Sequence, residues 1–137
     1  MAFADSQSGA IILSAEDVCR VQLIGTVVRG DAVGWSSGWI RALGTTSGVI
    51  QIRCVALEDG VADQYINVAF GATLIGGARF TGATANGSVY VAEGTSNGKY
   101  TQTVPDTSGD ATTPVGVALS ASVLLINPAH AADSVQA

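Results

Sequence analysis

Alternation of apolar and polar residues at every second position is the main pattern along the chain. Short stretches of this kind cover residues 18–24, 49–57 and 64–70, and the apolar runs 115–119 and 122–126 close the set as further predicted strands. A period of two residues predicts strands with one buried face, and no stretch longer than about ten residues keeps a helical period. We therefore expect an all-β chain.

The stretch 49–57 is the clearest of these predicted strands. Gln51 and Arg53 are expected on one face, and the opposite face is expected to carry Ile50, Ile52, Cys54 and Ala56. The second face is uniformly apolar or small, so it is the face that we expect to be buried.

A unit of a hairpin followed by a strand occurs twice. Residues 30–42 and 87–101 each open with glycine, run through a short apolar strand, turn, and return through an aromatic residue near a cation. The turns are centred on Ser37-Gly38 and on Asn97-Gly98, and Asn-Gly is the stronger turn sequence because both residues tolerate positive φ. The strands that follow are 53–57 and 115–119. The pattern predicts a small single-domain β-barrel or sandwich of short strands with Gly-rich turns and an internal pseudo-repeat.

The chain divides into three predicted regions. Residues 1–14 begin with a small, polar stretch around Phe3 and are expected to form a flexible N-terminal arm. Residues 15–128 are expected to form the β domain, in which the Gly-, Ala- and Thr-rich stretch 71–87 separates the two halves. Residues 129–137 follow Asn127-Pro128 and are expected to be a C-terminal tail.

Charge is scarce in this sequence of 137 residues. Charged residues make up 12% and hydrophobic residues 47%, which indicates that much of the surface is covered by oligomer contacts. The net charge is -5, and the few arginines are scattered singly, so clustered cations for a phosphate backbone are missing and nucleic-acid binding is not expected.

Neither a membrane span nor a secretory signal is expected. No apolar run approaches the roughly 20 residues that a spanning helix needs. Near the N-terminus, no basic residue precedes the aliphatic run Ile11-Ile12-Leu13. Synthesis in the cytoplasm is the resulting expectation.

Metal and cofactor chemistry find little support in the sequence. Cys19 and Cys54 could form one disulfide, but they lack the paired spacing of a zinc site and are expected to be buried thiols. Asp106 and Asp110 lack the ligand series of a calcium loop. Gly76-Gly77-Ala78 lacks the Walker lysine and the dinucleotide glycine pattern. We therefore expect no metal site and no cofactor.

Catalytic groups are equally scarce. The single histidine, His130, falls in the predicted tail, where a rigid catalytic arrangement is difficult to build. The acidic pairs Glu16-Asp17 and Glu58-Asp59 are neighbours in sequence, so they are expected to be solvated rather than to face one another. The tripeptide Arg29-Gly30-Asp31 matches an adhesion motif, but such short matches arise readily by chance. No enzyme activity is expected.

Three segments resemble the small capsid decoration, or cement, proteins of tailed bacteriophages. They are Gly30 to Trp35, Gly87 to Val91 and Val115 to Leu119, and the similarity covers most of residues 10–128. The resemblance implies a β domain that forms a homotrimer on the outside of the expanded head and clamps neighbouring capsomers. It also implies that the arm contacts the major capsid protein, with candidate contact residues Phe3, Ala4, Asp5, Ser6, Gln7 and Ile11.

Aromatic side chains are the remaining candidates for an interface. Trp35 and Trp39 bracket a predicted turn, and Trp is enriched at binding hot spots; Tyr65 and Tyr90 join them as interface candidates. The alternative function is a virion-surface binding module, carbohydrate- or fibre-associated, with Trp35, Trp39 and Tyr90 as a stacking platform. An exposed, coplanar row of rings would favour sugar binding, and burial between subunits would favour a cement protein.

Overall fold

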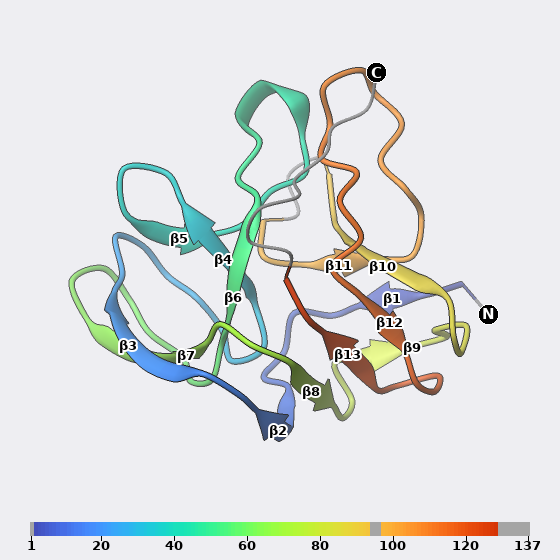
Figure 1. Cartoon of the computed structure of the whole chain (residues 1–137), viewed down its shortest axis with the longest axis horizontal. Coiled ribbons are helices and arrows are strands. Elements are labelled where there is room, and N and C mark those ends of the chain that lie inside the picture. Colours follow the sequence, from blue (N-terminus) through green and yellow to red (C-terminus); the bar gives the residue numbers. More distant parts are fainter. Residues whose placement is uncertain (1, 94–96, 129–137) are drawn as a thin grey trace.

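The computed structural model describes residues 2–93 and 97–128, and its strands form three antiparallel sheets (Figure 1). The predicted all-β fold is confirmed, and the open sheets make it sandwich-like rather than a closed barrel. Among the described residues, no helix is long or apolar enough to cross a membrane. The predicted tail, 129–137, lies outside the described residues, and His130 lies there with it.

The five-stranded sheet has the order β3-β7-β6-β4-β5. Its strands are β3 (Val18–Gln22), β4 (Ala32–Trp35), β5 (Trp39–Arg41), β6 (Ile52–Ala56) and β7 (Tyr65–Ala69). A short 3-10 turn, η1 (Thr46–Gly48), lies between β5 and β6.

The six-stranded sheet has the order β11-β10-β12-β13-β8-β2. Its strands are β2 (Ile11–Ala15), β8 (Thr73–Gly76), β10 (Ser88–Val91), β11 (Tyr100–Thr101), β12 (Gly116–Ala118) and β13 (Leu124–Ile126). The two-stranded sheet pairs β1 (Ala4–Asp5) with β9 (Phe80–Thr81).

Both large sheets follow the same plan. In each, a hairpin is followed by a strand that pairs with the first hairpin strand, then by a further strand that pairs with that one. An earlier strand completes the row, so the order β5-β4-β6-β7-β3 corresponds to β11-β10-β12-β13-β8. This correspondence confirms the predicted internal repeat, and β2 is an addition at the edge of the second copy.

The molecule has two apolar cores. One contains buried side chains from both large sheets, such as Val55 on β6, Val89 on β10 and Leu124 on β13, and it holds the sheets together. The other contains side chains of the five-stranded sheet and its loops. An isolated bridge from Leu23 to Trp39 brings the two ends of this sheet together, so the sheet curls around its own core.

The prediction that Ile52, Cys54 and Ala56 share one face of the strand at 49–57 is wrong for Ile52. Val33 pairs with Cys54, but the next partner of β4 is Ile52, so Arg53 is an extra residue in a β-bulge. The bulge turns Ile52 into the core between the sheets, whereas Cys54 and Ala56 face the core inside the curled sheet. A local insertion of this kind shifts the period by one residue and leaves no mark in the hydrophobic pattern.

The prediction of a flexible arm over residues 1–14 is wrong for the described residues 2–14. Residues 4 and 5 pair with β9, and residues 11–15 form the edge strand β2 beside β8 (Figure 1). The backbone amide of Ser6 donates to Arg79, and that of Ala10 donates to Arg29. A long-range partner therefore orders this segment, although the segment is too small and polar to carry an apolar stripe of its own.

Candidate functional site

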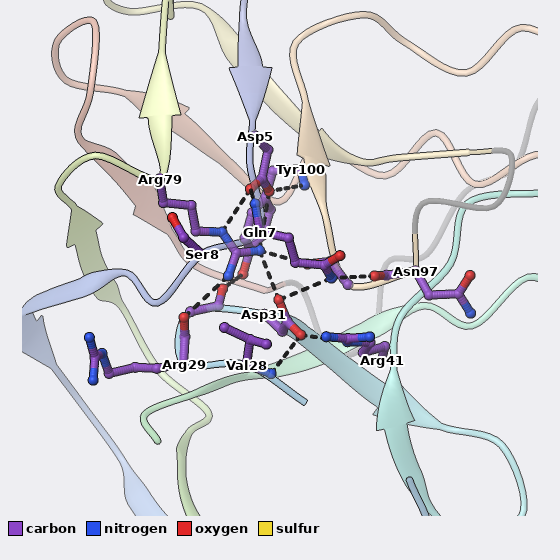
Figure 2. A network of polar contacts seen from close by, with 12 residues as sticks. Asp5, Gln7, Ser8, Val28, Arg29, Asp31, Arg41, Arg79, Asn97 and Tyr100 are labelled. Carbon is purple, nitrogen blue, oxygen red and sulfur yellow. Dashed lines mark hydrogen bonds and ion pairs between the residues drawn. The ribbon is translucent and has the colours of Figure 1, made fainter. Parts of the chain in front are cut away.

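Arg79 lies at the centre of a buried ionic network (Figure 2). Its side chain is 0% exposed, and its Nε lies 2.8 Å from Asp5 Oδ1. Its Nη2 lies 2.8 Å from Asp31 Oδ1 and 3.2 Å from Asp5 Oδ2. Three charged groups that are distant in sequence thus meet in the interior of the domain.

Other donors satisfy the two carboxylates. The backbone amides of Gln7 and Tyr100 donate to Asp5, at 2.8 and 3.0 Å. Asp31 accepts from the Arg41 Nε at 2.6 Å and from the Gln7 side-chain amide at 3.2 Å. Together with the Arg79 ion pairs, these bonds link residues 5–7, 31, 41, 79 and 100, so the network joins the N-terminal residues to both halves of the domain.

Two aromatic rings line the guanidinium. Its central carbon lies 5.4 Å from the Phe80 ring centre and 5.8 Å from the Tyr100 ring centre, within cation–π range. The Tyr100 hydroxyl donates to the Gly30 carbonyl at 2.9 Å. Burial raises the pKa of Tyr100 well above its ordinary value, although the nearby Arg79 charge opposes this.

The network is structural in character. Burial lowers the pKa of Arg79, but the facing carboxylates of Asp5 and Asp31 raise it more, so the pKa lies above its ordinary value and the charge is retained. No buried side-chain nitrogen or oxygen of the described residues lacks a hydrogen-bond partner. A site in which every charged group is already paired holds the fold together rather than waiting for a ligand.

The candidate contact residues of the N-terminal segment have different positions. Phe3 stacks on Phe80 with ring centres 6.2 Å apart, and Asp5 and Gln7 belong to the network. Ala4 and Ser6 are exposed. Ile11, on the edge strand β2, is 55% exposed and is the one large apolar side chain of this set that is free to contact another protein.

The adhesion motif is not presented to solvent. Asp31, its acidic residue, is buried and ion-paired to Arg79 and Arg41. Arg29 is exposed, but its Nε donates to the Ala10 carbonyl. A receptor that reads this tripeptide needs the carboxylate at the surface, so Asp31 cannot serve it in this fold.

A groove beside the β4–β5 hairpin is the best candidate for a binding site. Trp35 and Trp39 are cross-strand partners, and their rings meet edge to face, with centres 5.4 Å apart and planes at 81°. Trp35 is 60% exposed, whereas Trp39 is half-buried against Phe70. The groove has a volume of about 330 Å³ and is lined by Gln22, Leu23, Ile24, Trp35, Ser37, Gly38, Trp39 and Asp63. We call it the tryptophan groove.

Neither of the two tyrosines lines the tryptophan groove. Tyr65 is 57% exposed on β7, and Tyr90 is half-buried on β10 in the other large sheet. Since Trp35 and Trp39 are nearly perpendicular and Tyr90 belongs to a different sheet, the three rings do not form a coplanar row. The geometry expected of a sugar-stacking platform is therefore absent from these residues.

A second hollow is acidic. It is lined by Thr45, Thr46, Glu93, Thr107 and Asp110 and has a volume of about 210 Å³. A hydrogen bond between the two carboxyl groups raises the pKa of Glu93 and lowers that of Asp110, so Glu93 is the one of the two that takes up a proton first as the pH falls. Asp110 also accepts from the backbone amides of Thr46 and Thr107, at 2.7 and 3.1 Å. No group of three or more potential metal ligands occurs among the described residues.

The remaining candidate groups are individually placed. Cys19 is exposed, contrary to the prediction of two buried thiols, while Cys54 is buried and both are free. Burial raises the pKa of Cys54, which makes its thiol unreactive in the folded protein. Glu58 and Asp59 accept from the backbone amides of Asn67 and Arg29 respectively, so each carboxylate is bonded to another segment of the chain.

Comparisons with known proteins give no relative for this fold and site: no family model matches the chain, and neither a curated protein nor a solved structure is significantly similar to it.

Sequence reasoning found the tryptophans but missed Arg79 and Asp63. Arg79 is the only charged residue between Asp63 and Glu93, in a stretch otherwise rich in Gly, Ala and Thr. Such isolation is a usable signal, because a single charge within an apolar stretch is buried only when it is paired. Asp63 gave no comparable signal, since it lies in a polar loop.

Proposed function

We propose that this chain is a structural virion protein that binds the outer surface of a tailed-phage capsid and clamps neighbouring capsomers, without catalysis. In this proposal it is made in the host cytoplasm, acts as a homotrimer and has the major capsid protein as its partner. The proposal rests on the resemblance of three segments to capsid decoration proteins. It is supported by the surface of the described domain.

The observation that carries the proposal is the amount of exposed apolar surface on a domain with few charges. Nine large apolar side chains among the described residues are 44–60% exposed: Ile11, Leu13, Val18, Ile24, Trp35, Val61, Tyr65, Val104 and Leu119. Exposed apolar residues are common singly, but adjacent ones on a charge-poor surface mark contact sites. Ile11 and Leu13 on β2, and Ile24 and Trp35 at the tryptophan groove, form two such neighbourhoods.

In this proposal the capsid is contacted by the surface of the folded domain and not by a flexible N-terminal arm. The ionic network fixes residues 5 and 7, so a bound shell meets the outer face of the folded domain. Ile11 remains a candidate contact because it projects from an edge strand. Many weak contacts of this kind, repeated over a capsid lattice, add up to firm attachment through multivalency.

The test combines two measurements. Light scattering gives the mass of the purified protein, and sedimentation with expanded and unexpanded heads of the same phage measures binding. We expect a trimer that sediments only with expanded heads. A monomer that leaves both kinds of head unbound would contradict the proposal and favour a binding module.

Paired variants on one strand sharpen the test. Ile11→Ser removes an exposed apolar side chain from β2, and Ser14→Ala, also exposed on β2, is the matched control. Loss of the Ile11 contact is expected to weaken binding to heads about tenfold, since burying one such side chain stabilises by about 1.5 kcal/mol or more. The Ser14→Ala variant should bind as the original chain does.

A further inference from the structure

The tryptophan groove has two aromatic walls that meet at a corner. The Trp35 and Trp39 rings lie at 81° to each other, so an occupant of the corner meets the surface of two different indoles. The volume of about 330 Å³ is at the small end of ligand sites, which suits a single side chain better than an oligosaccharide.

The lining of the groove also carries a negative charge. Asp63 lines the groove, and no Lys or Arg does. The Asp63 backbone is held in place by its amide, which donates to the Leu23 carbonyl, and by its carbonyl, which accepts from the Gln22 side chain at 3.2 Å. Among the described residues, no hydrogen bond or ion pair occupies the Asp63 carboxylate. The nearest cation along β3, Arg20, is turned to the Tyr65 carbonyl instead, at 3.0 Å.

From this arrangement we infer that the tryptophan groove binds a basic side chain, with arginine preferred over lysine, presented by a protein partner. Indole surfaces attract cations through their quadrupole, and a planar guanidinium also stacks on them. The Asp63 carboxylate supplies the counter-charge for an ion pair. The inference rests on the proposed function only for the identity of the partner, which is then the capsid surface.

Charge complementarity is what separates this occupant from the alternatives. An aliphatic side chain would fill the same apolar corner but would leave Asp63 without a partner. A sugar ring favours a flat aromatic platform, which the perpendicular indoles do not offer. A cation uses both indoles and the carboxylate at once.

The test is a titration with N-acetylarginine amide, followed by the indole N–H signals of the two tryptophans in a ¹H–¹⁵N spectrum. The control ligand is N-acetylcitrulline amide, which has nearly the same shape but no charge. We expect the arginine ligand to shift both indole signals at concentrations about tenfold lower than the citrulline ligand, with the difference shrinking as salt is added. Equal effects of the two ligands, or none from either, would overturn the inference.

Variants assign the effect to the groove. Trp35→Ala removes a mostly exposed wall, and Tyr65→Ala, similarly exposed on β7, is its control. Asp63→Asn removes the charge, and Asp17→Asn is its control, because both aspartates are exposed and have positive φ, 72° and 55°. We expect only the two groove variants to weaken arginine binding, by about fivefold to tenfold.

Binding to phage heads distinguishes the failure of this inference from failure of the proposed function. If heads bind the original chain and the two groove variants equally, the groove is not the contact and the inference fails while the function stands. If heads do not bind but the arginine ligand does, the groove recognises a cation on another protein and the capsid assignment fails.

Discussion

Replacing Asp5 with alanine should lower the free energy of unfolding by about 3 kcal/mol, because it breaks one side of a buried ion pair. Asp5 is 2% exposed at its side chain and accepts from Arg79 through two nitrogens. Removing one partner of a buried pair costs about 3–5 kcal/mol, since the other charge stays in the interior. Asp31 still neutralises part of the Arg79 charge, which places the expected loss at the lower end.

Release of the N-terminal segment limits this loss. The Asp5→Ala variant leaves the Arg79 charge buried with one partner fewer. If this costs more free energy than the contacts of residues 2–8 contribute, the segment detaches and water reaches the Arg79 guanidinium. A chain that lacks residues 2–8 measures this limit directly. Asp5→Ala should therefore be no less stable than the shortened chain.

Urea unfolding, followed by tryptophan fluorescence, measures the effect. With a slope of about 2 kcal/mol per molar, a loss of about 3 kcal/mol lowers the midpoint by about 1.5 M. Glu16→Ala, which removes an exposed carboxylate, should change stability by less than about 0.5 kcal/mol. If Asp5→Ala shifts the midpoint no more than Glu16→Ala does, the network does not hold the N-terminal segment.

Three further predictions concern other parts of the domain. Gly116→Ala should lower the free energy of unfolding, measured in urea, by at least about 3 kcal/mol, because the added Cβ would collide with the backbone of the paired strand β13. The control Gly48→Ala adds a Cβ in open space and should change the free energy of unfolding by less than about 1 kcal/mol. A thiol reagent should modify Cys19 in the folded protein and Cys54 only after unfolding, so two reactive thiols before denaturant is added would contradict the buried position of Cys54. Glu93→Gln should raise Tm slightly at pH 7 but not at pH 4. Its hydrogen bond to Asp110 raises the pKa of Glu93, so a protonated Glu93 stabilises the fold below its ordinary pKa of 4.5, and this contribution is lost as rising pH ionises the group. An equal change in Tm at both pH values would contradict the raised pKa of Glu93.

Local sequence patterns predicted the strands because burial of one face imposes a two-residue period. The repeat was also predictable, since glycine turns and the following apolar strands recur at similar spacing in both halves. The bulge at Arg53 was not, because an added residue changes which face a side chain occupies without changing the composition of the strand. Residues 2–8 were misjudged for a different reason: their order depends on a partner 74 positions away.

The candidate site was predicted only in part. Trp35 and Trp39 could be chosen because bulky aromatics beside a turn are rarely all buried. Asp63 and Ile24 reach the same groove only because the sheet curls and Leu23 bridges to Trp39. Such closure depends on the three-dimensional course of the sheet, and residues from separate loops cannot be assigned to one groove before that course is known.

The distance in sequence between Asp5 and Arg79 also sets an order of events during synthesis. At 5–20 residues per second, the 74 positions that separate them take about 4 to 15 s to be made. A hairpin such as β4–β5 forms in about 1–10 μs, so the first half of the domain can pair its hairpin long before Arg79 exists. The N-terminal segment therefore docks late, and until then it is free to enter the Arg79 site of a neighbouring nascent chain. We therefore expect the characteristic misassembly of this fold to be exchange of the N-terminal strand between copies made on one polysome.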